Sequence, residues 1–210
     1  MSDVHEHLEH AEHVEHAAHS NKKIALVIAV LALFLAFSET LGKGAQTAAL
    51  SENIQASDLW NFFQAKNIRQ TVLRTAADTK AIELAAITDA AAKAAMEKQI
   101  DAWKKTIDRY ESEPSTNEGK MELTKRAQDT EHRRDMNFAK YENYELASAA
   151  FQIGIVLASA SVITGMLALV YGAAGLGAIG LMFTGFGVFA PEMLEHLQHM
   201  LEHAGPAAGH

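Results

Sequence analysis

Histidine is the residue type in this chain whose number and spacing could do chemistry. Six of the 11 histidines lie within the first twenty residues, and from His7 onward they recur at every third position. Glutamates four residues earlier would flank these imidazoles on a helix and support it modestly. Neutral imidazole beside carboxylate suits Zn, Ni or Cu. The candidate metal ligands of this tail are His7, His10, His13 and His16.

A second histidine set lies near the C-terminus. His196, His199 and His203 are spaced i, i+3 and i+7, so an amphipathic helix over residues 191–210 would gather them on one face. Such a face could hold a metal or respond to pH. The alternatives are an ordinary interfacial helix with a polar histidine side here, and a solvated acidic arm at the N-terminus.

Other chemistry is poorly supported. Without cysteine there is no disulfide, thiolate metal site or thiol nucleophile. The chain contains no Gly-rich phosphate loop, HExxH motif or nucleophile elbow, so we expect no enzyme, no catalytic residues and no cofactor-binding residues. The formal charge of -8 argues against nucleic acid as a partner.

The longest apolar stretch predicts a membrane hairpin. Residues 146–191 contain no Asp, Glu, Lys or Arg, enough for two bilayer-spanning helices, and we expect a transmembrane hairpin (helices 2 and 3) over residues 149–190 with its break at Gly172 and Gly175. Small residues form one stripe on each helix, with Ser161 and Thr184 able to hydrogen bond across. We interpret the stripes as close packing within the hairpin or against a second subunit; a pore lining is the alternative. The stripes are Gly154, Ala158, Ser161, Gly165, Ala168 and Gly172, then Ala173, Gly177, Gly180, Thr184 and Gly187.

A first transmembrane helix is predicted over residues 22–42. Its charge-free run covers only residues 24–38, so a span must continue through Glu39. A cleaved signal peptide is the rival interpretation, but the acidic leader is unlike a basic n-region. A carboxylate at this depth is a functional candidate for proton or ion coupling. The alternative is that Glu39 reaches headgroup water or pairs with Lys43.

The residues between the first two spans, 43–148, predict an extramembrane helical domain. Residues 45–113 lack Gly and Pro, with joints expected at 57–58 and 77–79. A turn is predicted at 113–119. Residues 120–145 would return antiparallel to a coiled-coil-like seam, and the Ala-rich stretch 85–95 would admit another helix closely. The seam residues are Met96, Ile100, Trp103, Ile107 and Tyr110.

These elements together predict an all-α membrane protein. Three transmembrane helices would carry a projecting antiparallel helical hairpin between the first and the second. The expected segments are a His/Glu-rich tail at 1–21, a first span at 22–42, the helical domain at 43–148, the transmembrane hairpin at 149–190 and a histidine-bearing tail at 191–210.

The segment SNKKIALVIAVLALFLAFSETLGKGAQTAALSENIQASDLWNFFQAKNIRQTVLRTAAD, with the return into a two-helix membrane end, resembles a bacterial family of membrane proteins known only as a domain of unknown function. The resemblance covers about residues 20–190 and leaves out the two histidine-bearing tails. It implies an inner-membrane location and brings no activity or catalytic residues.

The favoured function is a structural or scaffolding membrane protein that self-associates or docks a membrane-protein partner through its helical domain. A divalent-metal-binding or metal- or pH-sensing protein that uses the histidine tails is the first alternative, and an ion channel is the second. The small-residue stripes and the Ala-rich stretch favour a homo-oligomer in the lipid bilayer. Basic residues near the membrane ends favour a cytoplasmic helical domain.

Overall fold

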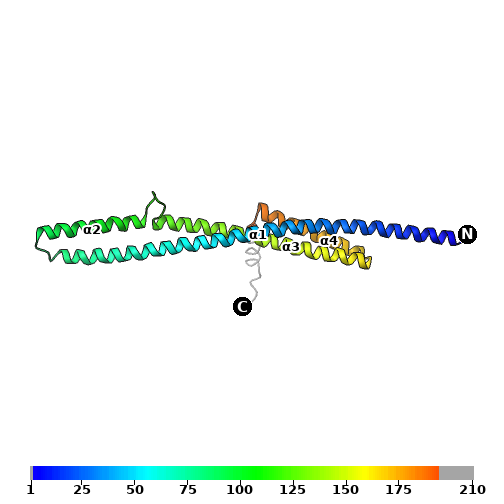
Figure 1. Cartoon of the computed structure of the whole chain (residues 1–210), viewed down its shortest axis with the longest axis horizontal. Coiled ribbons are helices and arrows are strands. Elements are labelled where there is room, and N and C mark those ends of the chain that lie inside the picture. Colours follow the sequence, from blue (N-terminus) through cyan, green and yellow to red (C-terminus); the bar gives the residue numbers. More distant parts are fainter. Residues whose placement is uncertain (1, 194–210) are drawn as a thin grey trace, which may run out of the picture. The chain divides into compact units, whose positions relative to one another are not determined.

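The computed structural model describes the backbone of residues 2–193 and the side chains of residues 22–193. Within residues 2–193 it contains four helices and no strand (Figure 1). The chain divides into two compact units, residues 1–48 with 136–210, here called the apolar unit, and residues 49–135, the polar unit. The helices are α1 (Ser2–Leu84), α2 (Ala90–Glu111), α3 (Lys120–Thr164) and α4 (Leu167–Phe189).

Helix α1 is unbroken from the first predicted span into the polar unit. The joints expected at 57–58 and 77–79 are absent, because α1 continues through both to Leu84. Ser57, Asp58 and Asp78 are exposed. Their polar groups therefore reach solvent without ending the helix, while the opposite face of α1 packs against its neighbours through buried Ala56 and Ala77.

The chain reverses at residues 85–89, between α1 and α2. Asp89 is the N-cap of α2, and its side chain accepts a hydrogen bond from the backbone N–H of Ala92 at 2.7 Å. This position differs from the reversal predicted at 113–119. It also interrupts the Ala-rich stretch 85–95, which therefore does not form one continuous helical surface.

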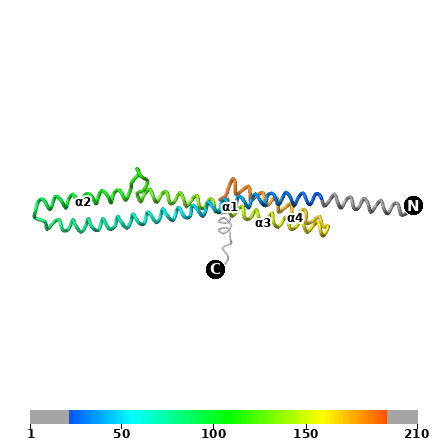
Figure 2. The backbone as a smooth tube through the Cα atoms, viewed as in Figure 1, coloured from blue at the N-terminus to red at the C-terminus, as the bar shows by residue number. Residues whose placement is uncertain are grey.

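Contacts within the polar unit show which helices are antiparallel. Trp60 donates to Glu131 on α3, whereas farther along α1 the Gln70 amide donates to the carbonyl of Ile107 on α2. Glu52 of α1 pairs with Arg133 and Asn67 with Lys120, so α3 numbers fall as α1 numbers rise and the first part of α3 runs against α1. Figure 2 shows that α2 also runs against α1. The predicted seam on α2 does face inward, with Ile100 and Ile107 buried, but its partner is α1 and not the segment 120–145.

Residues 112–119 form a closed loop between α2 and α3. The Glu122 carboxylate accepts from the Ser112 hydroxyl at 2.7 Å and from the Glu113 backbone N–H at 3.1 Å, which draws the ends of the loop together. A Cβ at Gly119 would overlap Glu122 and the Glu113 backbone, so only glycine fits there. The loop is a local excursion, of the compact kind whose ends lie close together.

The apolar unit packs the first part of α1 with the end of α3 and with α4. Helix α3 ends at Thr164 and α4 begins at Leu167, with Gly165 at φ +70° between them. The break predicted at Gly172 and Gly175 is therefore wrong. Both glycines lie inside α4, where backbone groups bond within the helix, whereas the left-handed conformation at Gly165 ends α3.

The small residues of α4 lie against large side chains of α1 and α3. A Cβ on Gly177 would approach Leu31 to 2.7 Å, and one on Gly180 would approach the Phe151 ring to 2.7 Å. The stripe therefore serves close packing within the chain. The Thr184 hydroxyl forms its hydrogen bond across helices with the Ser38 hydroxyl of α1, at 3.0 Å. The Ser161 hydroxyl donates to the carbonyl of Met166 at 3.1 Å.

The outer surface of the apolar unit is rich in large apolar side chains. Helices α1, α3 and α4 are each long and apolar enough to cross a membrane. The exposed residues include Leu26, Leu33, Phe37, Ile153, Val156, Ile163, Leu167, Ile179, Leu181, Met182, Val188 and Phe189.

Candidate functional site

The charge-free stretches of α1, α3 and α4 have neighbouring ends. Glu39 follows the charge-free stretch of α1, and Glu145 precedes that of α3. The amide of Gln152 donates to Glu39 at 3.4 Å, which joins α3 to α1 at this level. The amide of Asn143 donates to the carbonyl of Pro191 at 3.0 Å, which joins α3 to the chain just after α4. Polar groups of three segments therefore gather where the apolar surfaces end.

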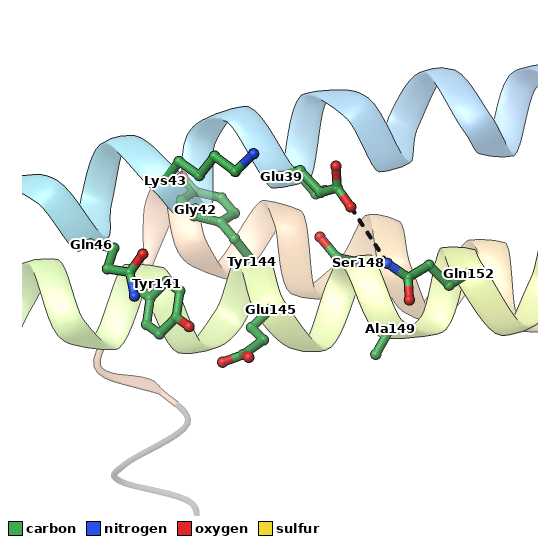
Figure 3. A pocket seen from close by; sticks show the side chains of 11 residues that line it. Glu39, Gly42, Lys43, Gln46, Tyr141, Tyr144, Glu145, Ser148, Ala149 and Gln152 are labelled. Atoms are coloured by element: carbon green, nitrogen blue, oxygen red, sulfur yellow. Dashed lines mark hydrogen bonds between the residues drawn. The ribbon is translucent and has the colours of Figure 1, made fainter.

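A polar cleft lies between α1 and α3 at this position and has a volume of about 420 Å³ (Figure 3). Figure 3 shows the Lys43 side chain extending along α1 toward Glu39, one helical turn away. The cleft is open, since Glu39, Lys43 and Glu145 are exposed. It is lined by Ser38, Glu39, Gly42, Lys43, Gln46, Tyr141, Tyr144, Glu145, Ser148, Ala149 and Gln152.

The electrostatics of the cleft are mixed. The negative charge of Glu145, followed by partial burial and a hydrogen bond to the same carboxylate, raises the pKa of the Tyr141 phenol. The phenol therefore stays protonated and donates. Among the described side chains, the Lys43 ammonium has no carboxylate within ion-pair distance. The cleft thus offers one lysine ammonium, two carboxylates and the Tyr141 ring to a ligand.

Sequence reasoning found one part of this site. Glu39, which was predicted as a functional candidate, lies in the cleft. Its carboxylate accepts a hydrogen bond from Gln152 and does not pair with Lys43. No role in a site was predicted for Tyr141, Glu145, Ser148 or Gln152. Glu145 could have been found from the sequence. It is the last charged residue before the charge-free stretch of α3, just as Glu39 is the first charged residue after the charge-free stretch of α1.

The predicted histidine ligands lie outside the described side chains. This applies to His7, His10, His13 and His16, and equally to His196, His199 and His203. Among residues 22–193, no group of three or more His, Cys, Asp or Glu side chains is arranged to hold a metal ion. Metal binding by the tails stays a prediction.

The fold and the cleft define a helical protein with three helices able to cross a membrane. A family model described as a domain of unknown function (DUF4337) matches residues 20–190, and the chain belongs to this family. The expected family resemblance is therefore confirmed, with both histidine-bearing tails at or beyond the edges of the match. No curated protein and no solved structure matches the chain.

Proposed function

We propose that this protein is an integral membrane scaffold that self-associates through its polar unit. In this proposal α1, α3 and α4 cross the bilayer and anchor residues 49–135. The observation that carries it is the arrangement of side chains in the apolar unit. Small and polar residues lie inside together with a few large ones such as Phe151, whereas many large apolar residues lie outside.

This arrangement favours lipid over water as the surrounding solvent. Leu26 is 66% exposed, Val156 65% and Phe189 88%. Moving one such side chain out of water is favourable by about 1.5–3 kcal/mol. The interior is held instead by close glycine contacts and by hydrogen bonds such as Ser38 to Thr184, which is how helices associate when lipid surrounds them.

A second apolar surface lies in the polar unit and supports self-association. Leu50, Ile54, Ile68, Val72 and Ile82, here called the α1 stripe, are all exposed. At 100° per residue they fall within about 80° of one another. The stripe therefore presents an apolar seam to solvent, on a different face from buried Ala56 and Ala77. A groove of about 520 Å³, lined by Val72 and by Trp103 of α2 among others, adjoins it.

The pattern of the α1 stripe favours a second copy of this chain as its partner. Asn61 lies seven residues after Ile54 and seven before Ile68, so the three share one heptad position, and Asn61 is exposed. An Asn at such a position specifies register between identical helices, at a cost in stability.

The proposed location is the bacterial inner membrane with the polar unit in the cytoplasm. Three crossings would place residues 1–21 opposite the polar unit. Lys22 and Lys23 lie at one end of the spans, and Lys43, Arg133, Arg134 and Lys140 lie near the other, which favours the cytoplasm for the second group. Protease treatment of spheroplasts should leave the loop at 112–119 uncut. Cleavage there would contradict the orientation.

The scaffold proposal is tested by extraction and by size measurement. Unmodified protein should stay in membranes washed with alkaline carbonate and should be oligomeric in mild detergent by light scattering. The double variant Ile68→Glu, Val72→Glu should stay membrane-bound but become smaller. Met121→Glu, which changes an apolar residue of α3 that is 63% exposed and lies outside the α1 stripe, is the matched control. A monomeric unmodified protein, or a double variant of unchanged size, would refute self-association through this face.

A further inference from the structure

We propose that the polar cleft binds the headgroup of a phospholipid that carries a phosphate and a primary ammonium, that is, a phosphoethanolamine headgroup. This inference rests on the membrane location proposed above. It assigns to Lys43 the phosphate and to Glu145 and Glu39 the ammonium.

The position of the cleft fits a headgroup. Its charged residues are those that border the charge-free stretches of α1 and α3, so in a bilayer they lie where headgroups lie. From the cleft, the same faces continue as apolar surface. Leu35, which is partly buried, lies one turn before Glu39 on α1, and Val156, which is 65% exposed, lies one turn after Gln152 on α3. Acyl chains attached to a bound headgroup would follow these residues into the hydrocarbon.

The charges of the cleft fit a zwitterion better than an anion. Lys43 is the one cation among the lining residues, and it has no ion-pair partner among the described side chains. A phosphate there would gain a charge-assisted hydrogen bond. An anionic headgroup would bring a further negative charge to Glu39 and Glu145, whereas a zwitterion brings no net charge and its ammonium can pair with a carboxylate.

The acceptors of the cleft favour a primary ammonium. An ammonium with three N–H donors can bond to carboxylate oxygens, which a quaternary ammonium cannot do. In Figure 3, Glu39 comes from α1 and Glu145 from α3. The Tyr141 ring lies beside Glu145 and adds an aromatic surface to which a cation is attracted. The volume of about 420 Å³ is within the range of small-molecule sites.

The test is lipid retention by the full chain in mild detergent, measured by native mass spectrometry. Phosphatidylethanolamine should be retained about tenfold more than phosphatidylglycerol or phosphatidylcholine. Lys43→Gln and Glu145→Gln should each remove about tenfold of that retention, and Lys43→Arg should keep it. Lys140→Gln and Glu142→Gln, on the same part of α3 but outside the cleft lining, are the matched controls and should bind like unmodified protein.

Each other result overturns the inference. Equal retention of phosphatidylglycerol would show a phosphate site without ammonium recognition, and equal retention of phosphatidylcholine would exclude the hydrogen-bonded ammonium. Calorimetric binding of free phosphoethanolamine without preference for the lipid would assign the cleft to a soluble ligand. Alkaline carbonate extraction of the same samples separates the two proposals. Release of the protein refutes membrane anchoring, whereas an anchored protein without lipid preference refutes only the headgroup site.

Discussion

Gly180 of α4 lies against the aromatic ring of Phe151 of α3, so closely that a Cβ at Gly180 would approach the ring Cε1 atom to 2.7 Å. Phe151 is fully buried and also stacks on Phe34 of α1, with ring centroids 6.0 Å apart, so the ring has little room to move. The contact joins three helices.

Replacing Gly180 with Leu should therefore destabilise the apolar unit, by about 1–3 kcal/mol, since overpacking forces side chains and backbone to shift. Thermal unfolding in detergent measures the effect. Gly175→Leu is the matched control, because nothing lies within 4 Å of a Cβ at that position of the same helix. Equal losses of stability in the two variants would show that the Phe151 contact is not decisive.

Asp89→Ala should lower stability by about 1 kcal/mol, because it removes the side-chain acceptor for the first turn of α2. Asp78→Ala is the control, since Asp78 is an exposed residue inside α1 and caps no helix. Denaturant unfolding of both variants checks the pair. A larger loss for Asp78→Ala would mean that α1 is interrupted at the joint that the sequence predicted at 77–79.

Lys66→Met should loosen the loop at 112–119. The Lys66 ammonium lies 3.9 Å from the Glu113 carboxylate and 3.7 Å from that of Glu118, and it sits over the Phe62 ring at 5.0 Å. Methionine keeps the packing of the stem but leaves the two carboxylates without their cation. Cleavage by a glutamate-specific protease within the loop should become several times faster. Lys80→Met, at a partly exposed ion pair on the same helix, should leave the cleavage rate unchanged.

Glu122→Gln should make the stability of the polar unit less dependent on pH. The hydrogen bond from Ser112 holds the pKa of the Glu122 carboxyl below its ordinary value of 4.5. A depressed folded-state pKa contributes stability that is present above the unfolded value and is lost as pH falls through the folded one. Unmodified protein should therefore exceed the variant in melting temperature at neutral pH, with the difference shrinking below about pH 4.5. A difference that stays constant down to pH 3 would exclude this carboxylate as the titrating group.

The sequence by itself determined which stretches are apolar and which faces of them are small or large. The stripe of Ala173, Gly177, Gly180 and Gly187 on α4 and the buried α2 residues Ile100 and Ile107 follow directly from helical periodicity. Such patterns are local, since each residue's place on its helix depends only on its neighbours in the chain.

Tertiary structure alone decided where the chain reverses. Residues 57–58, 77–79, 88–89 and 112–119 all contain residues that can begin or end a helix. A break costs helical hydrogen bonds at any of these positions. Tertiary packing therefore decides at which of them the helix ends. Asp89 became a cap and Asp78 stayed within α1, although their side chains are identical. The loop at 112–119 has the clearest turn composition, but its ends are held together by hydrogen bonds to Glu122. Helix α3 therefore continues in the same direction as α2.

The cleft shows the same division between local and distant information. Glu39 could be singled out because a carboxylate beside an apolar run is costly wherever that run is buried in lipid. Its partner Gln152 lies 113 residues away along the chain. Local sequence does not predict a contact at that separation, because the packing of α1 on α3 determines which residues come together.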